Sequence, residues 1–380
     1  MPPTSSLRLG IEEEYQIIDP ETRNLRYIVT RTARNEQPVL RGYDGDTALS
    51  AELTRAMTDL AKPASSQVAL LKEALVEQRS AICQLAESKG LLLAAAGTHP
   101  FASWKQSDMP LHGRYEGVME EMRVVAKRML IFGAHIHVVI EDPVEAIDVM
   151  NVVRYMLPHL LTLTSSSPFW AGRDTGLQSY RAILHDNLPR SGVPHYFASP
   201  SEYRHYVDLL LKTHCIRSEN DIWWDVRPHQ EYASLEFRLF DMMPVVEDVV
   251  GIVAVVQALV AWLLDLRSRN ISFRTYPRSL IEENKWRAER YGLDGKLIDF
   301  GKEQQLPART LVRELLRVIG PYVDRLGTRR EVDHLYTVIE RGTSADRQRR
   351  VYHQQGGKAN HDAALRAVVD SLVAETMICR

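Results

Sequence analysis

The stretch that decides the fold is LGIEEEYQIID, Leu9 to Asp19, in which three consecutive carboxylates stand between apolar residues. The apolar flanks predict a strand over Leu9–Ile18. Because side chains alternate between the two faces of a strand, Glu12 and Glu14 share one face and Glu13 points the opposite way. Two neighbouring carboxylates repel each other unless a cation binds them, one takes up a proton, or both face water. The stretch alone therefore leaves two interpretations open, a divalent-cation site or an exposed edge strand.

Two further strands repeat this spacing. GAHIHVVIED places His135 and His137 two residues apart, and ASLEFRLFD does the same with Glu236 and Arg238. A buried ion pair is the simpler interpretation of Glu236 and Arg238. Two histidines on one face of an apolar strand instead favour a functional site. Three strands that each carry a polar i, i+2 pair in apolar surroundings predict a sheet with one polar face covering a site.

Composition excludes several classes of protein. The chain has 380 residues, 45% of them hydrophobic, and a formal net charge of -2, so nothing global indicates nucleic acid or an anionic membrane as a partner. Three widely separated cysteines form neither a metal-ligand spacing nor a disulfide framework, which favours a cytoplasmic protein. The N-terminus lacks the apolar segment of a signal peptide. The run VVGIVAVVQALVAWLL, Val249 to Leu264, is shorter than a membrane span and predicts a buried core helix.

The order of elements predicts an α+β fold, because strands come first and helices follow without regular alternation. We expect one domain over residues 1–380, with a helical part from about residue 246. Arg23–Gly45 is predicted to be a long loop and Arg341–Arg350 a charged connection. Besides the first strand, we predict strands at Leu91–Gly97, Ile131–Ile140 and Ala233–Phe240. We predict helices at Ser65–Lys89, from Pro143 to about Thr164, at Val249–Leu266, Pro277–Tyr291 and Leu311–Leu326, and from about Asn360.

Oxygen ligands dominate the polar pairs, so Mg²⁺ or Mn²⁺ fits them better than a structural Zn²⁺. Mg²⁺ held by carboxylates usually also binds a substrate phosphate. The chain has neither G-x-x-x-x-G-K-[ST] nor G-x-G-x-x-G after a strand. A nucleotide would therefore be held by metal and arginines, and a Gly/Pro-rich segment supplies three candidates: Arg173, Arg181 and Arg190.

Taken together and in order, these motifs resemble the carboxylate–amine ligases of the type 2 glutamate–cysteine ligase group. The segments that carry the resemblance are LGIEEEYQIID, AAGTHPFASW, FGAHIHV, SSPFWAGRDTGLQSYR, LPRSGVP and DIWWDVRPHQEYASLEFRLFDMMP. The resemblance implies a glutamine-synthetase-like fold, a curved, mainly antiparallel sheet with helices on its convex side. It also implies ATP and Mg²⁺ or Mn²⁺ as cofactors, and a carboxylate activated as an acyl phosphate that an amine then attacks.

By motif position, the resemblance implies Glu236 and Arg238 as catalytic residues. The implied metal ligands are Glu12, Glu14, Glu52, Asp59, His135 and Glu236, with Asp59 standing where the family more often has Glu. The nucleotide contacts expected are His137, Arg173, Arg181, Arg190 and Arg238. The substrates expected are glutamate, through its γ-carboxylate, and cysteine or another amine, with weak glutamate–cysteine ligase activity. No nucleic acid or membrane partner is expected, and a homodimer is expected on base rates alone.

Two alternatives stay open. HIHVVIE, with His135, His137 and Glu141, matches the first metal motif of cupins, although a jelly roll would contain far fewer helices. A catalytically weak relative that binds metal and nucleotide for regulation would carry the same carboxylates. ADP release that requires both a carboxylate and an amine separates a ligase from these alternatives.

Overall fold

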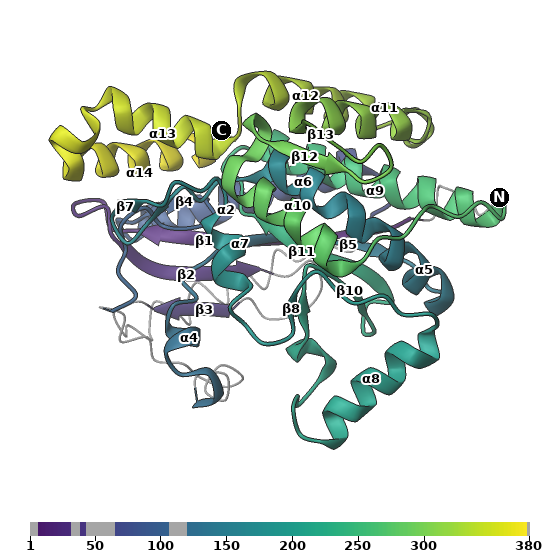
Figure 1. The fold of residues 1–380 in the computed structure, drawn as a ribbon. Helices are drawn as coiled ribbons and strands as arrows, with labels where there is room; N and C mark the ends of the chain where they lie inside the picture. The colour runs from purple at the N-terminus through teal and green to yellow at the C-terminus, as the bar shows by residue number, and fades with distance from the viewer. Residues whose placement is uncertain (1–6, 32–38, 43–64, 106–119, 378–380) are drawn as a thin grey trace.

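A seven-stranded sheet forms the centre of the molecule (Figure 1), in a computed structural model that describes residues 7–31, 39–42, 65–105 and 120–377. The strand order is β10-β11-β5-β1-β2-β3, with β4 also paired to β1, and each of these pairs is antiparallel. The strands are β1 Leu9–Ile18, β2 Leu25–Arg31, β3 Val39–Gly42, β4 Leu92–Ala94, β5 Gly133–Val139, β10 Val226–His229 and β11 Ser234–Asp241. The first predicted strand has the predicted bounds, and the other three are confirmed with shifted ends.

Three short strand pairs lie outside this sheet. They are β6 Phe169–Trp170 with β7 Arg173–Asp174, β8 Ser191–Gly192 with β9 Trp223–Trp224, and β12 Lys296–Asp299 with β13 Gln304–Pro307. The β8–β9 pair is parallel.

Helices cover one face of the sheet and make up most of the C-terminal part (Figure 1). All the helices of the described residues, whichever side of the sheet they lie on, are α2 Val68–Ser88, α4 Val124–Lys127, α5 Pro143–Val153, α6 Leu157–Thr164, α7 Tyr180–His185, α8 Pro200–Lys212, α9 Val246–Ser268, α10 Arg278–Tyr291, α11 Ala308–Leu326, α12 Arg329–Arg341, α13 Ser344–Gln354 and α14 His361–Met377. Short 3₁₀ turns occur at Arg154–Met156, Glu219–Asp221, Gly292–Asp294 and Gly357–Asn360. The helical C-terminal part begins with α9, as predicted.

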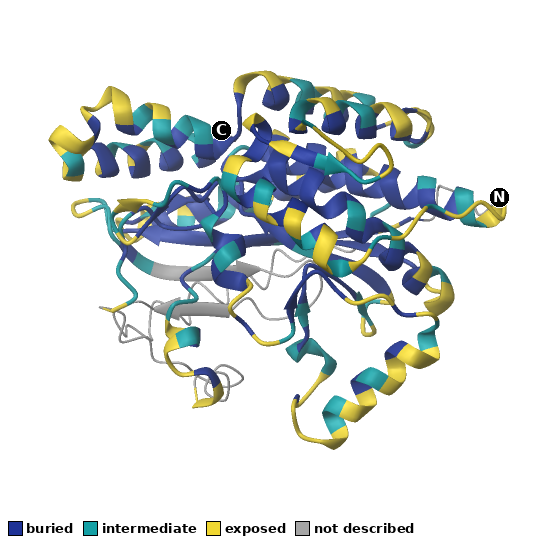
Figure 2. Ribbon diagram, in the orientation of Figure 1, coloured by how far each residue is buried: buried dark blue, intermediate teal, exposed yellow. Residues whose placement is uncertain are grey.

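Helix α9 is the core of the molecule, because it is apolar on all sides and packs against the sheet, α2, α11 and α12. It is long and apolar enough to cross a membrane, yet 89% of its most apolar window is buried inside the structure. Figure 2 shows it among the buried elements. The prediction of a buried core helix is confirmed.

The helix predicted from Pro143 starts as expected but does not run unbroken. Asp142 caps it by accepting a hydrogen bond from the backbone N–H of Val144. Proline has no N–H to give to the carbonyl four residues earlier, so Pro158 cannot bond Arg154 as a continuous α-helix requires. The chain passes through a 3₁₀ turn at Arg154–Met156 before α6 begins.

Two predicted connections were wrong. The loop expected at Arg23–Gly45 contains β2 and β3, because β1 gives β2 a hydrogen-bonding partner and β2 in turn gives β3 one. The connection expected at Arg341–Arg350 is mostly helix α13, which starts at a capping box formed by Thr343 and Asp346. The charges that suggested a loop lie on a partly exposed helix.

Candidate active site

One face of the central sheet is polar, as the i, i+2 pairs predicted. The register places Glu12 of β1 opposite His135 of β5, and His137 opposite Glu236 of β11. We call this the polar face, defined by Glu12, Glu14, His135, His137, Arg227, Glu236 and Arg238. Its residues come from four adjacent strands that are far apart in the sequence.

Three of these side chains converge. The Nδ1 atom of His135 lies 3.1 Å from Oε2 of Glu12 and 3.8 Å from Oε1 of Glu236. One ligand atom from each of the three residues lies within 4.8 Å of the others. His137 approaches from the same side, with Nε2 3.4 Å from Oε1 of Glu12.

The charges at this cluster suit a divalent cation. Burial opposes ionisation of Glu12, but hydrogen bonds with His135 and His137 outweigh it and lower the pKa of Glu12. Burial likewise opposes ionisation of Glu236, and the positive charges of Arg227 and Arg238 lower its pKa well below the usual value. Burial and the charge of Arg238 lower the pKa of His135. Two carboxylates and one neutral imidazole form a donor set that fits Mg²⁺ or Mn²⁺.

Glu14 lies on the polar face, as predicted, but not in the three-residue cluster. Its Oε2 accepts a hydrogen bond of 2.6 Å from the backbone N–H of Gly133. Metal ligation by Glu14 stays a prediction. Glu52 and Asp59 lie outside the described residues.

The middle carboxylate of the triple Glu has a structural role on the opposite face. Glu13 accepts hydrogen bonds from Arg79 of α2, with Oε1 2.5 Å from Nη2, and from the hydroxyl of Tyr15. Arg79 also donates to the backbone carbonyl of Pro244, at 2.6 Å. The pair therefore ties β1 to α2 and to the connection between β11 and α9.

Two arginines contact Glu236, and they differ in how many of their N–H groups already have a hydrogen-bond partner. Arg227 donates through Nε to Glu236 at 2.7 Å and through Nη1 to the carbonyls of Ile222 and Glu219, at 2.7 and 3.2 Å. Arg238 donates to Glu236 through Nη1, and its Nε has no hydrogen-bond partner among the described residues. Arg227 therefore serves as the structural counter-ion, whereas Arg238 keeps donors for a ligand.

His137 is packed from the side of the β10–β11 hairpin. Its Nδ1 lies 3.1 Å from Oγ of Ser234, and the rings of His229 and Tyr232 lie 5.5 and 5.4 Å from its own. Those two rings stack on each other at 4.5 Å. These contacts orient His137 toward Glu12.

Sequence analysis gave no role to Arg227, His229 or Tyr232. A signal existed for the first two, because VRPH repeats the i, i+2 spacing on a fourth strand. Pro228 lies between them, which the strand tolerates because β10 is at the edge of the sheet.

The three candidate arginines of the Gly/Pro-rich segment are not brought together. Arg173 is exposed on β7. Arg190 donates to the carbonyl of Asp221 at 3.1 Å and lies over the ring of Trp223. Arg181 is buried at the end of β11, where it donates to the backbone carbonyls of that strand.

Comparison with known proteins decides the family. A family model described as "Glutamate-cysteine ligase family 2 (GCS2)" matches residues 8–371. The chain belongs to this family.

Relatives agree along nearly the whole length of the chain. A protein of Herpetosiphon aurantiacus named "Putative glutamate--cysteine ligase 2" is 46% identical over 369 residues, which are 97% of this chain and 93% of the relative. A protein of Chloroflexus aurantiacus with the same name is 44% identical over 369 residues, covering 97% and 92%.

Solved structures share the fold. The crystal structure of a glutamate–cysteine ligase from Francisella tularensis in complex with AMP matches with a TM-score of 0.59 at 13% identity, covering 97% of this chain and 89% of that one. A bifunctional glutathione synthetase from Pasteurella multocida matches with a TM-score of 0.55 at 13% identity, covering 98% and 53%. The predicted fold, a curved antiparallel sheet with helices and a helical C-terminal part, is confirmed.

The structure does not support the cupin alternative. The third residue of its motif, Glu141, lies beyond the end of β5, is exposed, and pairs with Arg8 at 3.1 Å. The cluster of Glu12, His135 and Glu236 instead takes its carboxylates from β1 and β11.

A second cluster of side chains of the kinds that bind metals is already paired with a lysine. His185, Asp186 and Asp225 place ligand atoms within 4.8 Å of one another. The buried ammonium of Lys285 lies 2.7 Å from Oδ1 of Asp186 and 2.8 Å from Oδ2 of Asp225. This group is an ion-pair network that joins α7 and the β9–β10 connection to α10.

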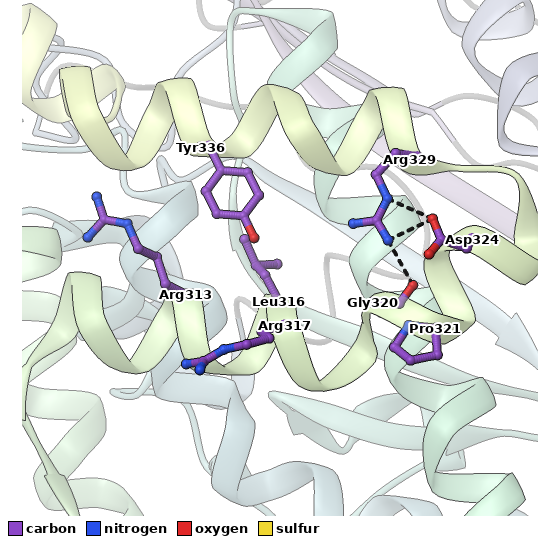
Figure 3. A pocket seen from close by; sticks show the side chains of 8 residues that line it. All are labelled: Arg313, Leu316, Arg317, Gly320, Pro321, Asp324, Arg329 and Tyr336. Carbon is purple, nitrogen blue, oxygen red and sulfur yellow. Dashed lines mark hydrogen bonds and ion pairs between the residues drawn. The ribbon is translucent and has the colours of Figure 1, made fainter.

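Two cavities in the described part of the chain lie away from the polar face. One of about 570 Å³ lies between α11 and α12, where Arg329 pairs with Asp324 and donates to the carbonyl of Gly320 (Figure 3). Another, of about 330 Å³, lies beside α5 and the end of α9. Neither is lined by a residue of the polar face.

Proposed function

We propose that this chain is an ATP-dependent carboxylate–amine ligase that joins the γ-carboxylate of glutamate to cysteine or another amine. A carboxylate oxygen attacks the γ-phosphorus of ATP, which forms an acyl phosphate and releases ADP. The amine nitrogen then attacks the acyl carbon and loses a proton, and phosphate leaves with one oxygen of the carboxylate. The observation that carries the proposal is the convergence of Glu12, His135 and Glu236 beside Arg238, in a member of this family.

Mg²⁺ or Mn²⁺ would be held by Glu12, His135 and Glu236, with Glu14 beside them. The ion would supply positive charge to the phosphates of ATP. The low pKa values of Glu12 and Glu236 support this assignment, because both carboxylates are charged at neutral pH.

The protein's own groups do the remaining work by positioning. His137 contacts one oxygen of the Glu12 carboxylate, Oε1, while His135 contacts the other, Oε2. The side chain of Arg238 is 15% exposed and lies beside the same site, so its guanidinium can meet a phosphate oxygen. Phosphoryl transfer is catalysed chiefly by such positioning and charge neutralisation.

The support for ATP as the nucleotide and for cysteine as the amine comes from the family and its relatives. The Francisella ligase holds AMP, which supports a nucleotide site in the shared fold. The names of the relatives support glutamate and cysteine as substrates. Direct nucleotide contacts by Arg173, Arg181 and Arg190, and weak activity toward cysteine, stay predictions.

ADP release tests the function. With ATP, Mg²⁺ and glutamate fixed, ADP is measured across a panel of amino acids and amines that includes cysteine. The proposal predicts rapid ADP release only when glutamate and an acceptor are both present, and its loss in Glu12→Gln but not in Glu141→Gln, which alters an exposed carboxylate. Nucleotide binding without ADP release for any acceptor would favour the regulatory alternative.

A further inference from the structure

The strand that carries Glu236 and Arg238 contains a β-bulge. Phe237 pairs with Ile136 and Phe240 pairs with Ala134, so the two residues Arg238 and Leu239 stand opposite the single residue His135. The extra residue keeps both phenylalanines buried in the core while Arg238 stays on the polar face. The bulge also takes two backbone carbonyls out of the regular ladder.

Arg181 of α7 satisfies these two carbonyls. Its Nη1 donates to the carbonyl of Leu239 and its Nη2 to the carbonyl of Arg238, each at 3.2 Å. The side chain is 2% exposed, so this guanidinium has little surface to offer a ligand. Gly133 shares a face of β5 with His135 and His137, and a Cβ atom added to it would meet the Arg181 guanidinium, so this guanidinium lies on the side of the polar face.

The surroundings of Arg181 fix its position. A Cβ atom added to Gly133 would lie 2.2 Å from Nη2 and 2.8 Å from Cζ of Arg181, so only glycine leaves room for the guanidinium. The backbone N–H of Arg181 donates to Oγ of Ser167 at 3.0 Å. Ser179, the residue that caps α7, donates to Asp241 at the end of β11, at 2.7 Å.

We propose that Arg181 is a positioning residue: it holds the bulge at Arg238–Leu239 and thereby sets the direction of the Arg238 side chain toward the transferred phosphoryl group. Its kinetic consequence rests on the proposed ligase function. Lysine at position 181 keeps the charge but offers a single point donor, so it cannot hold both carbonyls in the planar geometry of a guanidinium.

Arg181→Lys tests the proposal, with Arg154→Lys as the matched control. Arg154 is also a buried arginine, 1% exposed, that donates to backbone carbonyls, at 3.2 Å to Asn151 and 2.9 Å to Pro194. Melting temperature, kcat and KM for ATP are measured on both variants. The Nε–H resonance of Arg238, assigned by its loss in Arg238→Lys, is followed by NMR.

Both variants are expected to lose a similar amount of thermal stability. Only Arg181→Lys is expected to lower kcat, by at least about tenfold with KM for ATP within about threefold, and to shift or broaden the Arg238 resonance. The proposal is overturned if that resonance stays in place, or if kcat stays within about twofold of wild type in an active enzyme. If the wild type shows no ligase activity, the proposed function fails and the resonance alone decides the positioning role.

Gly133→Ala tests the same contact with every arginine present, and it serves if Arg181→Lys does not fold. The added methyl group should displace the guanidinium and reproduce the lowered kcat and the shifted resonance. In the double variant the two effects should not add, because both act through one contact. A normal resonance in Gly133→Ala would contradict the proposal.

Discussion

Replacing Arg238 by lysine separates a catalytic arginine from a structural ion pair. Both side chains are positively charged, so the lysine of the variant can still neutralise Glu236, which Arg227 also contacts at 2.7 Å. What lysine lacks is the flat pair of parallel N–H donors that matches a phosphate. The substitution therefore removes the paired N–H donors of the guanidinium and keeps the positive charge of the side chain.

The size of the effect follows from the contacts. Arg238 donates to Glu236 through Nη1 and its side chain is 15% exposed, so we expect the loss of about one charge-assisted hydrogen bond to the phosphoryl group. Such a bond contributes about 1.5–3 kcal/mol, which corresponds to a roughly 10- to 150-fold lower rate. We expect a loss of about 10²-fold, or about 2.7 kcal/mol. Because Glu236 stays paired, the melting temperature should fall by only about 2 °C.

The assay measures turnover and stability on the same preparation. ADP release with glutamate and cysteine gives kcat per folded molecule, and calorimetry with a non-hydrolysable ATP analogue gives affinity, which should change by no more than a few-fold. Arg227→Lys is the contrasting variant, because it loses two bonds to backbone carbonyls and should lower the melting temperature more than the rate. Normal turnover in a destabilised Arg238→Lys enzyme would refute the catalytic role and leave a structural ion pair.

Three further predictions concern metal binding and pH. Glu12→Gln should abolish saturable Mn²⁺ binding, measured by electron paramagnetic resonance. It should not lower the melting temperature of the metal-free protein, because it relieves repulsion between neighbouring carboxylates. Mn²⁺ binding equal to wild type would refute the ligand assignment. His135→Ala should raise the Mg²⁺ concentration for half-maximal activity more than His137→Ala, because only His135 lies within reach of both carboxylates, and equal shifts would contradict this distinction. Burial, together with the carboxylates of Asp186 and Asp225, outweighs the attraction of Lys285 and raises the pKa of Glu289 from 4.5 to about 8. Between about pH 4.5 and 8 the folded state therefore keeps a proton on Glu289 that the unfolded chain loses. The contribution of Glu289 to the free energy of unfolding should fall over this range as the pH rises, by up to about 1.4 kcal/mol per pH unit. The free energy of unfolding of Glu289→Gln should depend less steeply on pH than that of wild type, and identical slopes would contradict the shift.

Local patterns predicted the strands that build the site. The bounds of β1 and the shared face of Glu12 and Glu14 follow from alternation alone, because one side of that strand must enter the core. The i, i+2 pairs on β5 and β11 could be found in the same way. What converts three pairs into one cluster is the strand order, which no local pattern contains.

The parts that escaped prediction depend on neighbours distant in the sequence. β2 is a short apolar run between arginines, and it becomes a strand because β1 offers it an edge. Lys285 reads as an ordinary helix residue until the fold brings it to Asp225, sixty positions away. The bulge at Arg238, and with it the role of Arg181, arises from the pairing of β11 with β5.

Transfer of oxygen from the carboxylate to phosphate tests the central claim most directly. Glutamate labelled with ¹⁸O in its γ-carboxylate is incubated with ATP, Mg²⁺ and cysteine, and the released phosphate is examined by mass spectrometry or ³¹P NMR. An acyl-phosphate route predicts one ¹⁸O atom in each phosphate, in step with ADP and amide formation, and no label with Glu12→Gln. Amide formation that leaves the phosphate unlabelled would contradict the account.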